Sequence, residues 1–156
     1  MTVRCAAAAA GLVGLILIAT PIASAQPAPD QNVKDIRAYP LAQGRYSTPD
    51  DFYFVFFRTP DGRACGIGPN GGPVGCDAVP ADAPPDTNQT VVNSWAPAQY
   101  RHSDTAAFTR DVDVLPVGYR LENWGATCAV EDENVVRCQT YNSHGFTLGR
   151  GYGELW

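Results

Sequence analysis

The chain has 156 residues, a formal charge of −5 and a hydrophobic content of 45%. This acidic balance argues against nucleic acid and anionic lipid as partners, because both require a basic protein surface. The length suits a single domain that buries a core of its own, preceded by a short targeting segment.

Residues 1–25 have the features of a cleaved Sec-type signal peptide. Arg4 precedes an apolar run from Cys5 to Ala19, and Ala23-Ser24-Ala25 supplies small residues at the cleavage positions. The run is short for a membrane span, and Cys5 precedes it whereas the lipidated cysteine of a lipoprotein follows it. A retained membrane anchor is the less well supported alternative. We therefore expect a secreted protein, extracellular or associated with the cell wall, with no stable membrane anchor.

After the leader, residues 26–32 are rich in proline and unpatterned, and we expect a flexible lead-in there. Residues 33–156 should form a single disulfide-stabilised β-rich domain. The first part of this domain, residues 33–46, has no clean apolar period. It predicts either a short helix or an edge strand broken at Pro40.

The stretch from Phe52 to Phe57 predicts the first clear strand. All of its residues except Val55 are aromatic, so both alternating faces are apolar. A half-buried strand would alternate with polar residues, and this pattern therefore predicts a strand covered on both sides. The segment Thr59–Gly62 predicts a turn, because its proline presets φ and its glycine lets the chain reverse.

A hairpin with an Asn70-Gly71 tip is predicted next. Asn-Gly is the preferred two-residue hairpin turn, because both central positions need positive φ. The register that follows sets Ile67 opposite Val74 and Cys65 opposite Cys76. Opposed Cα atoms are about 4.5–5.5 Å apart, which is within reach of a disulfide. The turn alone therefore predicts a Cys65–Cys76 bridge.

The middle of the chain carries weaker signals. Residues 81–90 form a loop by composition, and residues 91–95 predict a brief strand that Pro97 interrupts. Residues 112–115 return to strand-like alternation, and a Pro-Val-Gly turn follows them.

The second pair of cysteines sits in a sequence similar to that of the first. The segment from Gly62 to Ile67 matches the segment from Gly125 to Val130, with a cysteine at the fourth position of each. On the return, Val-x-Cys ends at Cys76 in the first copy and at Cys138 in the second. Two copies are too few for a solenoid, so this similarity predicts two related hairpins in one small β-structure.

A second hairpin centred on Glu133 sets Cys128 opposite Cys138 and Val130 opposite Val136. The four cysteines left after the leader allow three connectivities, and the two registers favour the two local bridges. An even number of cysteines in an exported chain, without zinc-like spacing, also indicates two disulfides. The predicted fold class is all-β or mainly β, a small compact antiparallel sheet built from two similar disulfide-bridged hairpins.

A family resemblance rests on Gly-x-x-Cys-x-[Ile/Val], on Val-x-Cys and on the Gly-Phe-Thr-Leu segment at Gly145–Leu148. From about Phe52 onward, the chain resembles small exported proteins of mycobacteria and related actinobacteria. The matching motifs are structural cysteines and glycines, and no activity is established for such proteins. The resemblance implies an exported compartment and this architecture, and no catalytic residues. The segment Asn142-Ser143-His144 departs from the pattern.

His102 and His144 raise the alternative of a hydrolase that acts on envelope material. Ser103 and Asp104 follow His102, and Ser143 precedes His144. A serine hydrolase needs the serine hydroxyl within hydrogen-bond reach of an imidazole that a carboxylate orients. Neighbours along a strand usually point different ways, and there is no Gly-x-Ser-x-Gly elbow. Histidines at surface turns are the better interpretation, and we predict no catalytic residue.

The segment Glu131-Asp132-Glu133-Asn134 offers oxygen ligands of the kind that calcium prefers. It lacks the spaced ligands and the glycine of an EF-hand loop, and a hairpin tip is expected to be polar in any case. We interpret this segment as a solvated turn and predict no metal and no cofactor.

The candidate recognition residues lie close together in sequence: Trp95, Tyr100, Arg101 and His102. Aromatic residues and arginine dominate binding hot spots. Trp124 and Trp156 are further rings that can stack on sugar or peptide. The alternative is that these large aromatics fill the core of a small β-protein. We expect a non-enzymatic extracellular or cell-envelope binding protein, with an envelope glycan or protein as its partner.

Overall fold

The computed structural model of the protein describes residues 35–51 and 53–156. The expected signal peptide (1–25) and lead-in (26–32) lie outside the described residues. Within these described residues, two short 3₁₀ turns and ten strands follow one another: η1 (Ile36–Ala38), η2 (Pro49–Asp51), β1 (Val55–Arg58), β2 (Ala64–Ile67), β3 (Val74–Cys76), β4 (Gln89–Asn93), β5 (Ala96–Arg101), β6 (Arg120–Asn123), β7 (Ala126–Asp132), β8 (Val135–Gln139), β9 (Gly145–Leu148) and β10 (Gly153–Leu155).

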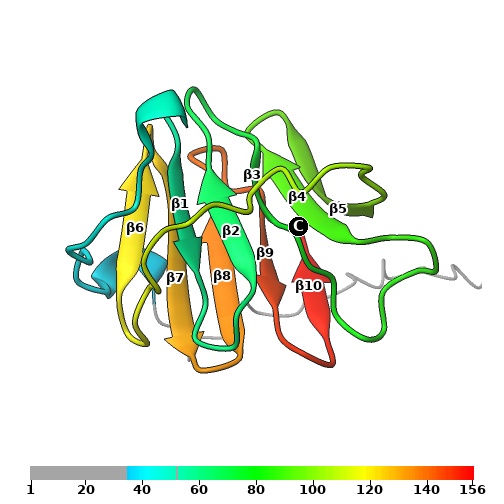
Figure 1. Ribbon diagram of the computed structural model, residues 1–156. Coiled ribbons are helices and arrows are strands. Elements are labelled where there is room, and N and C mark those ends of the chain that lie inside the picture. Colours follow the sequence, from blue (N-terminus) through cyan, green and yellow to red (C-terminus); the bar gives the residue numbers. More distant parts are fainter. Residues whose placement is uncertain (1–34, 52) are drawn as a thin grey trace, which may run out of the picture. The chain divides into compact units, whose positions relative to one another are not determined.

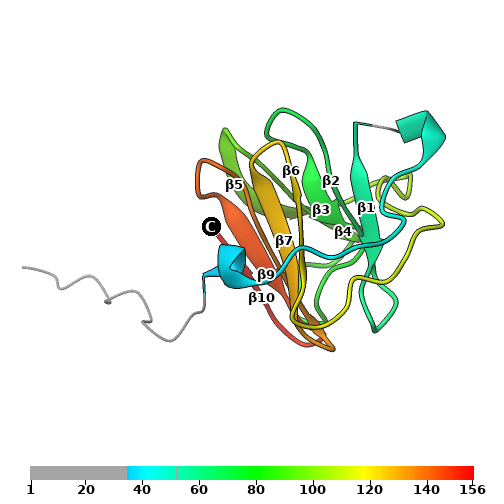
Figure 2. The ribbon, with the colours of Figure 1, turned by 90° about the vertical axis from the view of Figure 1, so that its left-hand side faces the viewer.

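The strands form two antiparallel sheets that lie face to face. Strands β1 to β5 make one sheet and β6 to β10 make the other, each in sequential order (Figure 1). The view turned by 90° shows the two sheets as separate layers (Figure 2). The predicted mainly β, antiparallel fold is confirmed. Each disulfide-bridged hairpin lies in a sheet of its own, as the second and third of five strands, so the two-fold similarity of the sequence extends to the order of the strands.

The first hairpin has the predicted register. Asn70 and Gly71 occupy the tip with φ angles of 53° and 89°. Ile67 pairs with Val74, and Cys65 pairs with Cys76. The two cysteines are joined by a disulfide, with their Cα atoms 4.0 Å apart. The prediction that turn chemistry brings these sulfurs together is confirmed.

The second hairpin keeps the predicted cysteine pair but has a different tip. Cys128 pairs with Cys138, and a disulfide joins them. The register shifts between Val130 and Asp132, so Glu131 is an extra residue on β7. This β-bulge moves the tip from a turn centred on Glu133 to a two-residue turn formed by Glu133 and Asn134.

The core lies between the two sheets and includes both disulfides. Side chains from both layers interdigitate there, and most of them are completely buried; those with no exposed surface are Phe57, Cys65, Ile67, Val74, Cys76, Leu115, Ala126, Cys128, Val130, Val136, Cys138, Phe146 and Leu148. Burial of this apolar surface is the main term that stabilises the sandwich, and the two bridges add about 3 kcal/mol each in the chain-entropy picture.

The aromatic strand β1 is covered on both faces, as predicted. Phe57 points into the main core, whereas Phe56 packs on the outer face of the first sheet with Phe108 and Val112. Phe108 belongs to the strap, which we define as residues 102–113, the segment that crosses this outer face after β5. The strand is shorter than predicted: it begins at Val55, and Phe52 lies outside the described residues.

Two glycines leave room for the strap to pack against the first sheet. Gly66 and Gly75 oppose each other in β2 and β3. A Cβ atom at either position would lie within 3.0 Å of the Phe108 ring, so the ring occupies space that any larger residue would fill. The glycines of the cysteine motifs therefore seat an aromatic side chain against the sheet.

Two local predictions were wrong. Pro97 does not interrupt a strand, because it lies within β5, an edge strand that carries one more residue than β4 between the pairs Val91–Gln99 and Asn93–Ala96. Edge strands and bulges tolerate proline, which cannot donate a ladder hydrogen bond. Residues 112–115 form no strand; a single bridge joins Val114 to the end of β1.

The segment that the sequence left open contains a short 3₁₀ turn and an isolated bridge. Ile36, in η1, is buried and η1 contacts β7. Leu41 makes a single parallel bridge to Arg120. Tyr46 is buried in the main core, and its hydroxyl donates to the carbonyl of Val114 at 3.2 Å.

Candidate binding surface

The structure separates the candidate recognition residues. Trp95 lies in the two-residue turn between β4 and β5 and is 70% exposed. Tyr100 and Arg101 lie at the other end of β5, where Arg101 pairs with Gln89 at the start of β4. The length of the strand therefore lies between the tryptophan and the other candidates.

Tyr100 has a packing role. Its hydroxyl contacts the backbone position of Gly153 in β10, and a Cβ atom at that glycine would collide with it. Burial, together with the nearby charge of Asp82, raises the pKa of Tyr100. The ring thus joins the edges of the two sheets. Trp156 adds a second link there, because its carbonyl oxygen accepts hydrogen bonds from the backbone of Ala98 and Gly145.

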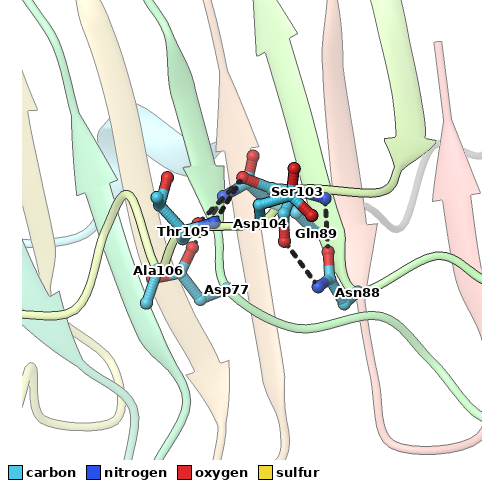
Figure 3. A pocket seen from close by; sticks show the side chains of 7 residues that line it. All are labelled: Asp77, Asn88, Gln89, Ser103, Asp104, Thr105 and Ala106. Atoms are coloured by element: carbon cyan, nitrogen blue, oxygen red, sulfur yellow. Dashed lines mark hydrogen bonds between the residues drawn. The ribbon is translucent and has the colours of Figure 1, made fainter.

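Arg101 belongs to a polar chain on the outer face of the first sheet, and Figure 3 shows two other members of this chain, Gln89 and Asp77. Its Nε donates to Gln89 Oε1 at 2.7 Å, and Gln89 Nε2 donates to Asp77 Oδ1 at 2.7 Å. The other carboxylate oxygen of Asp77 accepts from the backbone N–H of Phe108 and the hydroxyl of Thr109, each at 2.8 Å. Asp77 therefore anchors the strap to the sheet.

A polar hollow of about 260 Å³ lies beside this anchor. Its wall includes Asn88 and Ser103, whose amide and backbone groups exchange two hydrogen bonds of 2.9 Å. Figure 3 shows these groups turned toward one another. Since they satisfy each other, the hollow presents few unused donors to a ligand.

His102, beside this hollow, lacks the arrangement of a catalytic triad. Its ring nitrogens lie 3.1 Å from the carbonyl oxygen of Asp86 and 3.2 Å from Asp104 Oδ1. The Asp104 side chain is 96% exposed, so it orients the ring only weakly. The hydroxyl of Ser103 donates to the carbonyl of Thr105 at 2.8 Å instead of to the imidazole.

His144 lies far from His102, in the turn between β8 and β9. Its carbonyl accepts hydrogen bonds from the backbone and hydroxyl of Thr140. No hydrogen bond or ion pair of its ring is found within residues 35–51 and 53–156. The two histidines thus stand at opposite ends of the strands and form no common site.

The structure brings together a different set of residues, at the end of the sandwich that carries Trp95. Four exposed rings gather there on turns from both sheets, and we call this surface the aromatic end: Tyr53 (57% exposed), Trp95 (70%), Trp124 (56%) and Tyr141 (50%). Tyr53 precedes β1, Trp124 lies between β6 and β7, and Tyr141 lies between β8 and β9.

Contacts between the turns make this surface continuous. The backbone N–H of Ser94 donates to the carbonyl of Gly71 at 2.8 Å, and Asn142 Nδ2 donates to the carbonyl of Ser94 at 2.8 Å. A Cβ atom at Gly71 would lie 2.9 Å from Tyr141 Cε1, and one at Gly125 would lie 3.4 Å from Tyr141 Cβ. Tyr141 therefore lies between the turn of Trp95 and the turn of Trp124.

The remaining ring is fixed to the same end by Asn123. Its Nδ2 donates to the carbonyl of Tyr53 at 2.8 Å and to the carbonyl of Ile67 at 2.9 Å. This side chain connects the segment before β1 with β2 and with the turn that carries Trp124. The aromatic end is thus preorganised by hydrogen bonds among its turns.

Trp124 is held in a strained backbone conformation. It has a φ of 48°, and Gly125 beside it has a φ of 82°, the pattern of a type I′ turn. The first position of such a turn favours asparagine, aspartate or glycine, and a bulky residue at positive φ is an outlier. Such strain costs about 1–3 kcal/mol and is typical of functional sites.

The turns of the aromatic end carry no lysine or arginine. The turns at 69–72, 94–95, 124–125 and 141–143 contain no charged residue, and the segment that carries Tyr53 adds two carboxylates, Asp50 and Asp51. Nearby in η2, Asp51 accepts a hydrogen bond from Arg110 Nε at 2.7 Å. That hydrogen bond lowers the pKa of Asp51 and pairs its charge.

The other features singled out from the sequence have structural roles. Trp156 is half-buried, with the Arg137 guanidinium 5.6 Å from its ring centroid. The acidic tip of the second hairpin lies at the opposite end, where Glu131 is 3.7 Å from Arg137 and Asp132 accepts from the backbone of Asn134. Among the described residues, no group of three or more metal-ligand side chains is found.

Comparison with known proteins found no matching family model, no matching curated protein and no matching solved structure. Over residues 35–51 and 53–156, no helix has the length and apolar character needed to cross a membrane.

Proposed function

We propose that the protein is an exported, non-enzymatic binding module that holds an extracellular or cell-wall partner through the aromatic end. Four exposed rings on rigid turns from both sheets are the observation that supports this proposal most strongly. Large exposed apolar patches on a soluble protein mark interaction sites, and aromatic residues dominate binding hot spots.

The strain at Trp124 supports the same proposal. The turn between β6 and β7 would form more readily with asparagine, which tolerates positive φ. A tryptophan at this position lowers the stability of the fold, and its ring is 56% exposed to solvent. Because this ring destabilises the fold and is mostly exposed, a role in binding a partner accounts for it.

Two disulfides are compatible with the proposed location. Cys65–Cys76 and Cys128–Cys138 lie at the centre of the core, and such bridges persist in oxidising compartments. Mass spectrometry of culture supernatant tests export directly: we expect a chain that begins at Gln26. A chain retained in membranes with its leader intact would contradict this part of the proposal.

The hydrolase alternative has weaker geometric support. Its most specific observation is the His102–Asp104 contact, and the serine between them donates elsewhere. If the alternative holds, replacing His102 or His144 with alanine abolishes any turnover of envelope material by the protein. The binding proposal expects no turnover to lose.

Co-sedimentation with washed cell envelopes tests the binding function. We expect saturable binding of the oxidised protein, lost in the double variant Trp95→Ala/Trp124→Ala. Tyr152→Ala is the matched control, because Tyr152 is 48% exposed on the turn between β9 and β10, at the other end of the sandwich. Equal sedimentation of the native protein and the double variant would overturn the assignment of the aromatic end.

A further inference from the structure

We propose that the partner of the aromatic end is an uncharged polysaccharide, whose sugar rings stack on Trp95, Tyr141 and Trp124. This inference rests on the proposed binding function and names its ligand class. It follows from the kind of apolar surface exposed at this end, from its charge and from the order of its rings.

The large apolar side chains exposed at this end are all rings. The large aliphatic side chains exposed among the described residues lie elsewhere: Leu41 bridges the start of β6, Val114 bridges the end of β1, and Val117 follows it. These strand ends are the ones remote from Trp95. The C–H face of a pyranose matches the flat face of an aromatic ring.

The edges of the rings supply polar groups for sugar hydroxyls. An indole presents one N–H donor, and a tyrosine hydroxyl both donates and accepts. A ring with an apolar face and a polar edge suits a ligand that has both characters. Each such side chain has only two rotatable torsions, so little conformational entropy is lost on binding.

The charge of this end excludes an anionic polymer. The four turns carry no lysine or arginine, and Arg110, which lies nearby, is paired with Asp51. A polymer with phosphate, sulfate or carboxylate groups would meet no free cation there, and the negative charge of the protein would repel it. An uncharged polymer avoids both costs.

The order of the rings suits a chain rather than a single sugar. Tyr141 lies between the turn of Trp95 and that of Trp124, and Asn123 ties the Tyr53 segment to the Trp124 side. Successive sugar units of one chain can therefore lie on successive rings. Binding should strengthen with chain length until all of the rings are covered, because each added contact is intramolecular.

The test is to titrate the oxidised exported protein with uncharged oligosaccharides and to measure binding by tryptophan fluorescence and by calorimetry. The probes are cello-, malto- and chito-oligosaccharide series, with hyaluronan as the anionic comparison. We expect at least one uncharged series to bind, with about tenfold higher affinity for the longest members than for the disaccharide. High salt should leave this affinity unchanged, because no charge pair is involved.

Variants distinguish stacking at this end from adventitious sugar binding. Trp95→Ala or Trp124→Ala should weaken the affinity about tenfold or more, and Tyr152→Ala should leave it unchanged. The inference is overturned if none of the uncharged series binds, if hyaluronan binds best, or if the tryptophan variants bind as the native protein does.

The two proposals fail in different ways. If the double variant loses envelope binding but no uncharged oligosaccharide binds the native protein, the ligand class is wrong and the binding function stands. If the double variant keeps envelope binding, both are wrong. Dimerisation of the native protein that is lost in the double variant would identify a second copy of the chain as the occupant, and would also overturn the polysaccharide.

Discussion

The two ends of the sandwich are held together by different interactions. At the aromatic end, amide and backbone hydrogen bonds hold the turns, and the largest side chains point into solvent. The opposite end, which we call the clamped end, is formed by the turns after β1, β7 and β9. It is closed by an ion pair of Asp61 and Arg63, whose side chains are only 6% and 12% exposed.

Arg63 joins all three turns of the clamped end. Its Nε donates to Asp61 Oδ1 at 3.0 Å within the first turn. Its two terminal nitrogens donate to the carbonyl of Leu148 at 2.8 Å and to the carbonyl of Asn134 at 2.6 Å, both in the second sheet. One side chain thus connects the two sheets, and each of its three nitrogens donates a hydrogen bond.

The two ends therefore differ in what they contribute: one stabilises the fold and the other, as proposed, binds a partner. At the clamped end the polar groups form hydrogen bonds and ion pairs with one another, and their role is structural. The aromatic end keeps a strained turn and unburied rings, which no single-domain fold needs. If this division is correct, substitutions at the clamped end change stability without changing binding, whereas removal of an exposed ring at the aromatic end reduces binding without destabilising the fold.

The largest effect is expected from Arg63→Met at the clamped end. The variant leaves Asp61 as a buried charge without its main partner and removes the donors for two carbonyls of the second sheet. Breaking one partner of a buried pair costs about 3–5 kcal/mol. Urea denaturation should show this loss in the free energy of unfolding, while envelope binding of the folded fraction stays native.

Arg150→Met is the matched control for that variant. Arg150 Nε is 3.5 Å from the same carboxylate, but its side chain is 71% exposed. Exposed ion pairs contribute about 0–1 kcal/mol, so the control should unfold near the native urea concentration. Equal destabilisation by the two variants would show that Arg63 is not the link between the sheets.

A smaller loss is expected from Gly71→Val at the aromatic end. Gly71 has a φ of 89°, and a Cβ atom there would lie 2.6 Å from Ser94 Oγ. Strain and overlap together should cost about 2–4 kcal/mol, and the displaced turn should also weaken binding. Thermal unfolding measures the first effect and envelope co-sedimentation the second.

The control for Gly71→Val is Gly151→Val. Gly151 lies in the turn after β9, its φ is not positive, and a Cβ atom there would meet nothing within 4 Å. We expect this variant to unfold and bind like the native protein. A native melting temperature for Gly71→Val would contradict the Asn70-Gly71 tip that the register requires.

Turn chemistry made the disulfide-bridged hairpins predictable. Asn70-Gly71 alone fixes which residues face each other, and the cysteines fall into register as a consequence. The second tip was misplaced because the bulge at Glu131 has no signal in its sequence. Pro97 was misread because a lone strand cannot reveal whether it will lie at an edge.

The aromatic end was predictable only in part. Trp95 and Trp124 were singled out because tryptophan is prominent in binding sites, but Tyr53 and Tyr141 were missed. Their convergence depends on how two sheets pack, and period-2 alternation describes a strand without its neighbours. One signal was available: Trp-Gly at 124–125 stands between two strand patterns, where the first turn position normally needs a small polar residue.

Asp61 at the clamped end should contribute to the pH dependence of stability, as should Asp51 near the aromatic end, whose pKa is also lowered. Burial of Asp61 raises its pKa, but hydrogen bonds from Thr59 and Arg63 and the Arg63 charge outweigh burial, so the pKa is lowered from its ordinary value of 3.8. A lowered folded-state pKa stabilises the fold above the unfolded value, and this stability is lost as pH falls below it. Urea midpoints measured from neutral to acidic pH should fall, and Asp61→Asn should flatten that fall.

The smallest change in stability is expected from Trp124→Asn, and it has the opposite sign. Asparagine adopts the positive φ of a type I′ turn more readily than tryptophan, so the free energy of unfolding should rise by about 1 kcal/mol. The same variant removes one of the rings, so envelope and oligosaccharide binding should fall about tenfold. Thermal unfolding and titration on one preparation measure both quantities. A variant that is more stable and still binds normally would show that Trp124 lies outside the binding surface, and a variant that is less stable would show that the ring contributes to the fold after all.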